Sequence, residues 1–268
     1  MDLLSKTRLI IVTLCVGGLL AEVASAQNNK SATQSSSSTT QSTNSAALES
    51  TQPASSAGQS DIQKRIHSAA AVLDEIMSTP DKGIPDKIMD SARCVVVIPS
   101  EIRIAVGFGG RHGRGVATCR NTNGWSAPAP VTITGGSWGL QIGGEAVDLV
   151  MMVMSERGVD DLLSSKFKIG AGASAAAGPV GRQIAAGTNY KLQSEILTYS
   201  RARGVFAGID LNGAVIEQDR DETRVLYGKM VPFADILKGN IAPPKGSSGF
   251  EAAVEKYYSQ AKQREHAG

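Results

Sequence analysis

The feature that most constrains the fold is a series of short, strand-like segments that begins at Cys94 and is broken repeatedly by glycine. The apolar runs have the length and the β-branched content of strands. Asn123-Gly124 and Asn212-Gly213 are typical of hairpin turns, so the pattern predicts antiparallel pairing. The expected strands are Cys94–Ile98, Arg103–Phe108, Gly115–Arg120, Val131–Thr134, Leu140–Ile142, Ala146–Met154, Lys166–Ala176, Tyr190–Tyr199, Gly204–Asp210 and Ala214–Gln218.

Helical patterns lie mainly at the two ends of this strand region. Residues 61–78 carry apolar side chains at every third or fourth position, and Pro80 and Gly83 end the pattern. Further helices are expected at Pro85–Arg93, Ser155–Leu163, Asp221–Tyr227, Phe233–Leu237 and Phe250–Lys262. This arrangement favours an α+β fold, with an antiparallel curved or barrel-like β-sheet flanked by N- and C-terminal helices.

The N-terminus has the three parts of a secretory signal peptide. Lys6 and Arg8 precede an uncharged apolar run, Leu9–Ala21, and Ala24-Ser25-Ala26 has the small residues that signal peptidase requires. The alternative is a transmembrane anchor, but a span needs roughly 20 apolar residues and this run is shorter. We therefore expect residues 1–26 to be cleaved and the protein to be exported.

Composition divides the remaining chain into three parts. Residues 27–60 are rich in Ser, Thr and Gln and have few apolar side chains, which predicts a disordered tether. Residues 61–262 suit one domain with a sizeable core, and residues 263–268 form a polar tail. The formal net charge of +2 gives no reason to expect nucleic-acid binding.

After cleavage the chain would retain two cysteines, Cys94 and Cys119, each in a strand-like run. An even number of cysteines in an oxidising compartment favours a disulfide. Two buried free thiols are the alternative. Two cysteines without nearby histidines cannot complete a tetrahedral metal shell, so no metal site is expected. No cofactor is expected either.

The segment Gly107–Gly115 resembles a phosphate-binding loop, although its glycine spacing fits neither common nucleotide motif. Arg111, His112 and Arg114 would place three potential cations beside exposed backbone amides. A flexible connection between two strands is the simpler interpretation. The segment therefore predicts either a hairpin loop or an exposed anion site.

Gly135-Gly136-Ser137-Trp138-Gly139 fits the G-x-S-x-G pattern of a nucleophilic serine. The later histidine, His266, lies in the polar tail, and the flanking segments are strand-like on both sides. The pattern thus lacks the strand-to-helix turn of a serine hydrolase. We expect a protein that is not an enzyme, with catalysis by Ser137 as a remote alternative.

The glycine segments, taken in order, resemble the SYLF domain, also called the Ysc84 domain. The matching segments are Ser91-Ala92-Arg93 with Val95–Pro99, Gly107–Val116, Trp125–Pro128, Gly135–Gly143, Gly178–Arg182, Tyr199–Gly208 and Tyr227-Gly228. The resemblance implies binding of phosphoinositides and other acidic membrane lipids without catalysis. It also implies a link to actin, which fungal members bind. The export signal indicates an exported bacterial member in the periplasm, outside the cell or at the membrane surface. It also makes actin an improbable partner.

Two elements could carry lipid binding. Residues 61–78 form an amphipathic helix with Lys64 and Arg65 beside its apolar stripe, and such a helix can lie in a membrane interface. The second element is the segment with Arg111, His112 and Arg114. The helix could equally pack on the sheet, and an envelope structural or adaptor role with a protein partner is the alternative function.

Overall fold

The computed structural model describes residues 54–79, 83–106, 108–138, 143–170, 174–179, 194–202, 205–208 and 211–267. The strands are β1 (Cys94–Val106), β2 (Phe108–Asn121), β3 (Gly124–Trp125), β4 (Ala129–Trp138), β5 (Gly143–Val153), β6 (Lys166–Lys168), β7 (Ala175–Ala177), β8 (Ile196–Ala202), β9 (Val205–Gly208) and β10 (Val215–Gln218). The helices are α1 (Ala54–Ser78), α2 (Asp86–Ser91), α3 (Glu156–Leu163), α5 (Arg220–Tyr227), α6 (Phe233–Leu237) and α7 (Gly249–Ala267).

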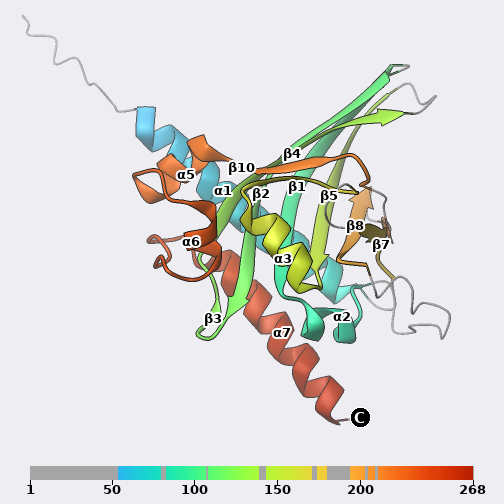
Figure 1. The fold of residues 1–268 in the computed structure, drawn as a ribbon, viewed down its shortest axis with the longest axis vertical. Helices are drawn as coiled ribbons and strands as arrows, with labels where there is room; N and C mark the ends of the chain where they lie inside the picture. The colour runs from blue at the N-terminus through green and yellow to red at the C-terminus, as the bar shows by residue number, and fades with distance from the viewer. Residues whose placement is uncertain are drawn as a thin grey trace, which may run out of the picture. The chain divides into compact units, whose positions relative to one another are not determined.

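Hydrogen bonding orders the sheet β6-β10-β4-β2-β1-β5-β8-β7, with β3 paired to β2 and β9 to β8. Within the described residues, the β7–β8 pair is parallel and the other pairs are antiparallel. The sheet curls into a half-barrel, with helices from both ends of the chain beside it (Figure 1). The predicted α+β class with a curved antiparallel sheet is confirmed.

Apolar side chains cover both faces of the central strands. Val95 and Val97 of β1 join one cluster with α1 and α7, whereas Val96 and Ile98 join a second cluster with α3 and α6. Alternate residues of a strand point to opposite faces. The uninterrupted apolar run at the start of β1 therefore reflects burial on both sides.

Helix α1 packs against the sheet with the stripe that the sequence predicted. Ile62, Ile66 and Leu73 are fully buried in the core. The helix begins at Ala54, within the stretch assigned to the tether, because its first turns pack near α5, where Gly58 faces Val225. Residues 1–53, including the expected signal peptide, lie outside the described residues, as does the expected strand Leu140–Ile142.

The expected loop in the segment Gly107–Gly115 is wrong. Strand β2 runs without interruption from Phe108, and it pairs with β1 on one side and β4 on the other. The two strands expected before it are one long strand, β1, with a bulge between Val97 and Ile102. Within that bulge Ser100 adopts a φ of 55°, and its N–H donates to Asp148 Oδ1 at 3.0 Å.

The two Asn-Gly turns differ in what they connect. The turn before Gly124 closes the β2–β3 hairpin, as predicted. The turn at Asn212-Gly213 does not close a hairpin, because β9 pairs with β8 and β10 pairs with β4 and β6. Gly213 N–H instead donates to the carbonyl of Ile169 at 2.8 Å.

The disulfide is confirmed. Cys94 and Cys119 lie directly opposite each other at the start of the β1–β2 pair, and they are bonded. Both are buried in the cluster beneath α3 and α6. The link therefore joins two central strands within the covered part of the sheet.

Helix α7 extends to Ala267, so residues 263–267 are helical rather than a tail. Its first turns carry Phe250 and Val254 into the core. No described helix has the length and apolarity needed to cross a bilayer.

Candidate functional site

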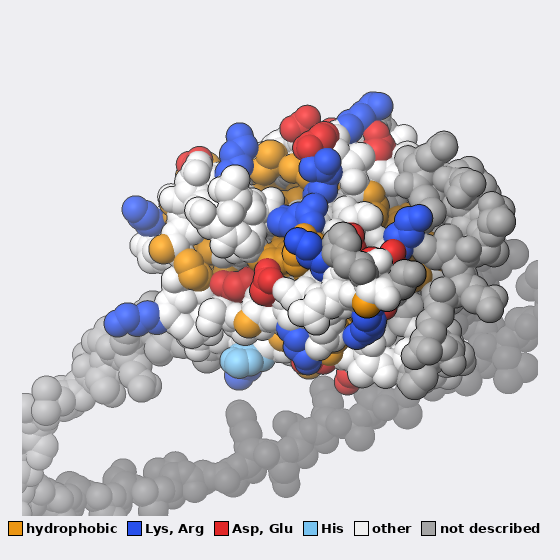
Figure 2. Space-filling model, turned by 90° about the horizontal axis from the view of Figure 1, so that it is seen from below, with side chains coloured by type: hydrophobic (Ala, Val, Ile, Leu, Met, Phe, Trp, Pro, Cys, Tyr) orange, Lys and Arg blue, Asp and Glu red, His pale blue; other side chains and the backbone are white. Residues whose placement is uncertain are grey.

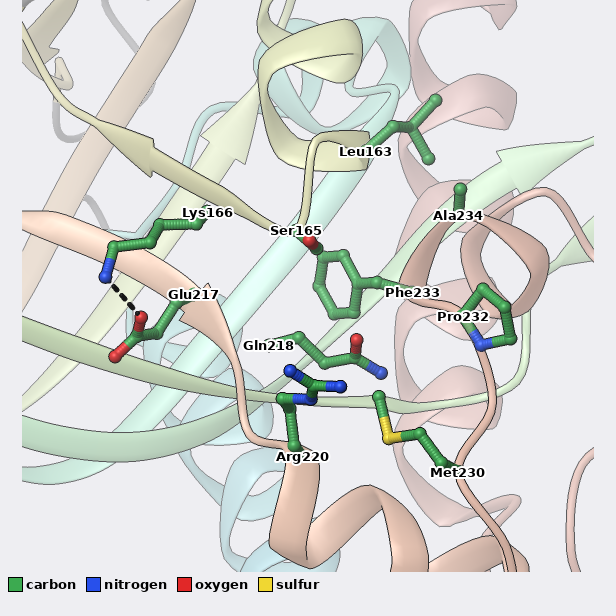
Figure 3. Close-up of a pocket in the computed structure, with 10 residues that line it drawn as sticks. All are labelled: Leu163, Ser165, Lys166, Glu217, Gln218, Arg220, Met230, Pro232, Phe233 and Ala234. Atoms are coloured by element: carbon green, nitrogen blue, oxygen red, sulfur yellow. Dashed lines mark ion pairs between the residues drawn. The ribbon is translucent and has the colours of Figure 1, made fainter.

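A hollow of about 530 Å³ opens at the edge of the sheet formed by β6 and β10. Figure 3 shows Lys166 and Glu217 on one side of this pocket, Met230 and Pro232 on the other, and the ring of Phe233 between them. The remaining lining residues come from the end of α3 and the turn after it, from β10 and from the first residues of α5 and α6; they are Leu163, Ser165, Gln218, Arg220 and Ala234. The pocket thus joins an apolar wall to a charged rim, as small-molecule sites commonly do.

The charges at the rim sum to one positive charge. Lys166 Nζ lies 3.0 Å from Glu217 Oε2, so this pair is close to neutral. Arg220 is exposed, and no ion pair among the described residues engages it. Arg220 can therefore offer several N–H donors to an anionic group, and its planar guanidinium suits phosphate or carboxylate.

Local sequence fixes the walls of the pocket. Asp219 caps α5 by accepting a hydrogen bond from Glu222 N–H at 3.0 Å, which sets the position of Arg220. Pro232 precedes α6 and directs Phe233 into the core. Gln218 donates from Nε2 to the Val231 carbonyl at 2.9 Å. The base of the pocket is thereby tied to the segment between α5 and α6.

The two candidate cations of α1 are not equivalent. Lys64 is exposed and lies 3.4 Å from Asp61. Arg65 is largely buried and forms an ion pair with Glu222 of α5. The apolar stripe of α1 is also buried in the core, so over residues 61–78, whose side chains the structure describes, this helix has no free apolar face with which to enter a membrane interface.

The three candidates of β2 are separated by the alternation of the strand. Arg111 is mostly buried beside the fully buried Glu101, with Arg111 Nε 3.7 Å from Glu101 Oε1. His112 is exposed on the opposite face. Arg114 lies on that face too and contacts Asp219 and Glu222 at 3.5 Å each. The structure therefore brings Arg65 and Arg114 together on Glu222 but leaves Lys64, Arg111 and His112 apart from them.

Figure 2 shows how charge is distributed over one face of the molecule. Lys and Arg side chains are spread across this face, interspersed with Asp and Glu, and hydrophobic side chains are visible between them. Among the described residues of this view, the cations do not merge into one broad basic surface. Recognition of an anion would therefore depend on a local site such as the pocket.

Ser137 lies near the end of β4, where its backbone pairs with Gly109. A nucleophilic serine of the G-x-S-x-G type needs a sharp turn from a strand into a helix. The backbone at Ser137 is extended, so that geometry is not present. Within the described residues, no group of three or more His, Cys, Asp or Glu side chains could hold a metal ion.

A carboxyl group with a perturbed pKa lies away from the pocket, at the start of α7. Burial raises the pKa of Glu251 to about 7. Burial also raises the pKa of Tyr227, and the nearby Glu251 charge adds to that effect. Tyr227 Oη donates to the Pro128 carbonyl at 2.8 Å. This pair lies outside the lining of the pocket.

These features define an α+β domain with a curled sheet and a cationic, partly apolar pocket at one edge. A model of the Ysc84 family, described as "Las17-binding protein actin regulator", matches residues 134–257. The described domain therefore carries a Ysc84 domain, which is the SYLF-type family that the glycine segments resemble.

Three relatives illustrate this similarity. The chain is 30% identical to the rat SH3 domain-containing YSC84-like protein 1 over 192 residues, which is 69% of this chain and 56% of that protein. It is 33% identical to an SH3 domain-containing protein of Schizosaccharomyces pombe over 60% of this chain and 38% of that protein. It is 31% identical to Protein YSC84 of Saccharomyces cerevisiae over 61% of this chain and 36% of that protein. The chain thus spans little more than half of the rat relative.

The pocket was not predicted from the sequence. Lys166, Arg220 and Phe233 belong to three segments that contain no recognisable motif. A weak signal was available for Arg220, which follows the helix-capping residue Asp219, but capping alone does not indicate a pocket.

Proposed function

We propose that this domain is a non-catalytic module that binds the anionic headgroup of an acidic membrane lipid, such as a phosphoinositide, in the pocket of Arg220 and Phe233. The observation that supports this function is an exposed arginine beside an apolar wall, in a hollow large enough for a headgroup. The guanidinium would bind the phosphate, and Met230, Pro232 and Phe233 would contact the less polar part of the lipid.

The charge of the site favours an anion over a cation. Glu217 is balanced by Lys166, so Arg220 remains as the net charge at the rim. Attraction to an anionic bilayer contributes about 1 kcal/mol for each basic side chain near the surface.

The test is vesicle flotation of the full chain with neutral phosphatidylcholine alone or mixed with phosphatidylserine or a phosphoinositide. We expect flotation only with the anionic mixtures. Arg220→Glu should weaken that binding by about tenfold or more, because a repelling charge replaces an attracting one.

Arg224→Glu is the matched control, since Arg224 lies on the same helix, is exposed and pairs with Asp221 outside the pocket. Equal losses for the two variants would show general attraction between charges rather than a pocket. Absence of flotation with every anionic mixture would rule out the proposed function.

A second candidate is an adaptor that binds a protein partner. The family description names a Las17-binding actin regulator, and the yeast relative carries the name YSC84. These names therefore do not support the expectation that actin is an improbable partner. Cosedimentation of the purified chain with actin filaments, without lipid, would favour this candidate if the chain failed to float with vesicles.

A further inference from the structure

The backbone of Ser165, in the turn between α3 and β6, lies in the left-handed region, with a φ of 64°. This region is unfavourable for a residue that has a Cβ, and glycine is its usual occupant. The other described positions with a positive φ, apart from Ser100, hold glycine. Glycine would therefore suit the backbone at position 165 better than serine does.

The hydrogen bonds of this turn do not require the serine side chain. Ser165 N–H donates to the Leu162 carbonyl at 3.3 Å, and the Ser165 carbonyl accepts from Gln218 N–H at 2.8 Å. Both bonds use backbone atoms of residue 165, so glycine would form them equally well. They explain why the chain adopts this conformation, but they do not explain why the residue is serine.

Two consecutive serines in the turn use their hydroxyls differently. Ser164 Oγ donates to the Asp161 carbonyl at 2.6 Å and lies 3.0 Å from the Lys166 carbonyl, so it closes the turn. Ser165 is exposed and lines the pocket, and its hydroxyl has no hydrogen bond among the described residues. In Figure 3 this hydroxyl points toward the ring of Phe233. The fold thus uses the first hydroxyl and leaves the second available to a ligand.

The polar groups of the pocket are of two kinds. Arg220 carries a charge that no ion pair among the described residues balances, so it suits a phosphate. Ser165 precedes Lys166 in the chain, and Lys166 pairs with Glu217 at 3.0 Å. The Glu217 carboxylate would repel a second phosphate, but it can accept hydrogen bonds from hydroxyl groups. The Ser165 hydroxyl can both donate and accept. This part of the pocket therefore suits the uncharged hydroxyl groups of a ligand.

We propose that Ser165 is a specificity-determining residue of the pocket, whose hydroxyl binds the free hydroxyl groups of a polyol phosphate ester while Arg220 binds the phosphate. This inference rests on the proposed function and names the class of headgroup. The pocket would prefer phosphatidylglycerol, which carries glycerol hydroxyls, to phosphatidic acid, which does not. The unfavourable backbone conformation is then kept with serine because glycine would lack the hydroxyl.

Two substitutions separate the hydroxyl from the backbone. Ser165→Gly removes the hydroxyl and relieves the backbone, whereas Ser165→Ala removes the hydroxyl and leaves the backbone as it is. Flotation of the full chain would be measured with phosphatidylcholine vesicles that contain either phosphatidylglycerol or phosphatidic acid. Both variants should bind phosphatidylglycerol about fivefold more weakly than the parent chain and should bind phosphatidic acid nearly as the parent does.

Urea denaturation shows whether serine serves the fold instead. Ser165→Gly should unfold at a urea concentration at least as high as Ser165→Ala does, because glycine adopts this φ without strain. A Ser165→Gly chain that lost both stability and flotation would overturn the proposal. Ser164→Ala is the matched control: it should unfold at lower urea, since it loses the bonds that close the turn, and should keep the parent preference for phosphatidylglycerol.

A soluble polyol phosphate has the same chemistry as the lipid headgroup. Calorimetric titration of the parent chain with glycerol phosphate, without vesicles, distinguishes the two sources, and we expect much weaker binding than to the lipid. Tight binding that Ser165→Ala removed would support the role of Ser165 and assign the pocket to a soluble ester rather than to a lipid.

The outcomes of flotation separate this inference from the proposed function. If both Ser165 variants floated like the parent chain, or lost phosphatidylglycerol and phosphatidic acid equally, the role of Ser165 would be overturned. The headgroup function would still stand if flotation of the parent chain depended on Arg220. Absence of parent flotation with every anionic mixture would end both proposals.

Discussion

Strands β1, β2, β4 and β5 run from a part of the sheet that the helices cover to ends that project past the helices (Figure 1). The covered part and the projecting part differ in how they use glycine. In the covered part, Gly113 and Gly115 leave room for the bulged strand β1. A Cβ on Gly115 would lie 2.1 Å from the Val97 carbonyl oxygen, and one on Gly113 would lie 2.6 Å from Ile98. In the projecting part, Gly110 faces open space. Packing therefore requires glycine at Gly113 and Gly115 in the covered part, whereas no contact requires glycine at Gly110 in the projecting part.

This difference separates residues that maintain the fold from residues available for binding. The covered part contains the apolar clusters, the disulfide, the ion pair that links α1 to α5 and the one that links β2 to α5. The projecting part lacks such support among its described residues, where Gly110, His112 and Gly136 are exposed. Substitutions in the covered part should therefore lower the free energy of unfolding more than substitutions in the projecting part.

The largest expected effect is that of Gly115→Ala. The new methyl group would overlap a backbone oxygen in the core, and neither strand can move without breaking the β1–β2 pairing. We expect the free energy of unfolding to fall by about 3 kcal/mol or more. Urea denaturation followed by circular dichroism would measure it. A loss below about 1 kcal/mol would show that the covered part is less tightly packed than described.

Removal of the disulfide should have the next largest effect. The bond closes a loop with a sequence separation of 25, for which chain entropy predicts a loss of about 3 kcal/mol. The variant with Cys94→Ala and Cys119→Ala should unfold at lower urea and become insensitive to dithiothreitol. The parent chain should lose stability when reduced. If reduction left the urea midpoint of the parent chain unchanged, the disulfide would not stabilise the covered part.

Glu251→Gln should have a smaller, pH-dependent effect. The folded-state pKa of about 7 exceeds the ordinary value of 4.5, so the folded chain binds more protons than the unfolded chain between these values. Stability should therefore fall as pH rises from about 4.5 to about 7. The Gln variant should lose this slope and gain about 1 kcal/mol at pH 8, a figure reduced for solvent screening of a partly exposed group.

Thermal unfolding across this pH range would measure the effect. Glu255→Gln, at an exposed position of the same helix, is the control for loss of one charge and should keep the parent slope. The account of Glu251 would be wrong if the Gln variant and the parent chain showed the same slope.

The smallest expected effect on stability is that of Gly110→Ala. The added methyl group meets no atom, and alanine restricts the unfolded chain more than glycine does. We expect the free energy of unfolding to change by less than about 0.5 kcal/mol. A loss as large as that of Gly115→Ala would show that the projecting part is packed and would remove the contrast between the two parts.

The fold class and most elements were predictable because their signals are local. Periodicity located α1 and α7, Ser155 located the start of α3, and Asn123-Gly124 located a hairpin. The errors came from glycine. Glycine is common in loops, so the segment Gly107–Gly115 predicts a loop, yet Gly113 and Gly115 lie in a strand where the neighbouring strand leaves no room for a side chain.

The candidate site was less predictable because it depends on ion pairs between residues that are far apart in the sequence. Arg65 was expected to face a membrane, but it pairs with Glu222, which lies 157 residues later. Arg114 reaches the same carboxylate across 108 residues. The basic residues that the sequence suggests as lipid contacts, Arg65 and Arg114, thus form ion pairs with Glu222 in the folded domain. The sequence does not single out Arg220, because no residue near it in the chain indicates a binding role.

Hydrogen exchange of the full chain, with and without vesicles of phosphatidylcholine and phosphatidylserine, tests the central claim most directly. The account predicts that vesicles slow amide exchange in the pocket segments 163–166 and 230–234. It predicts no change in α1, whose apolar stripe is buried in the core. Protection that appeared in α1 and not in the pocket segments would contradict the account.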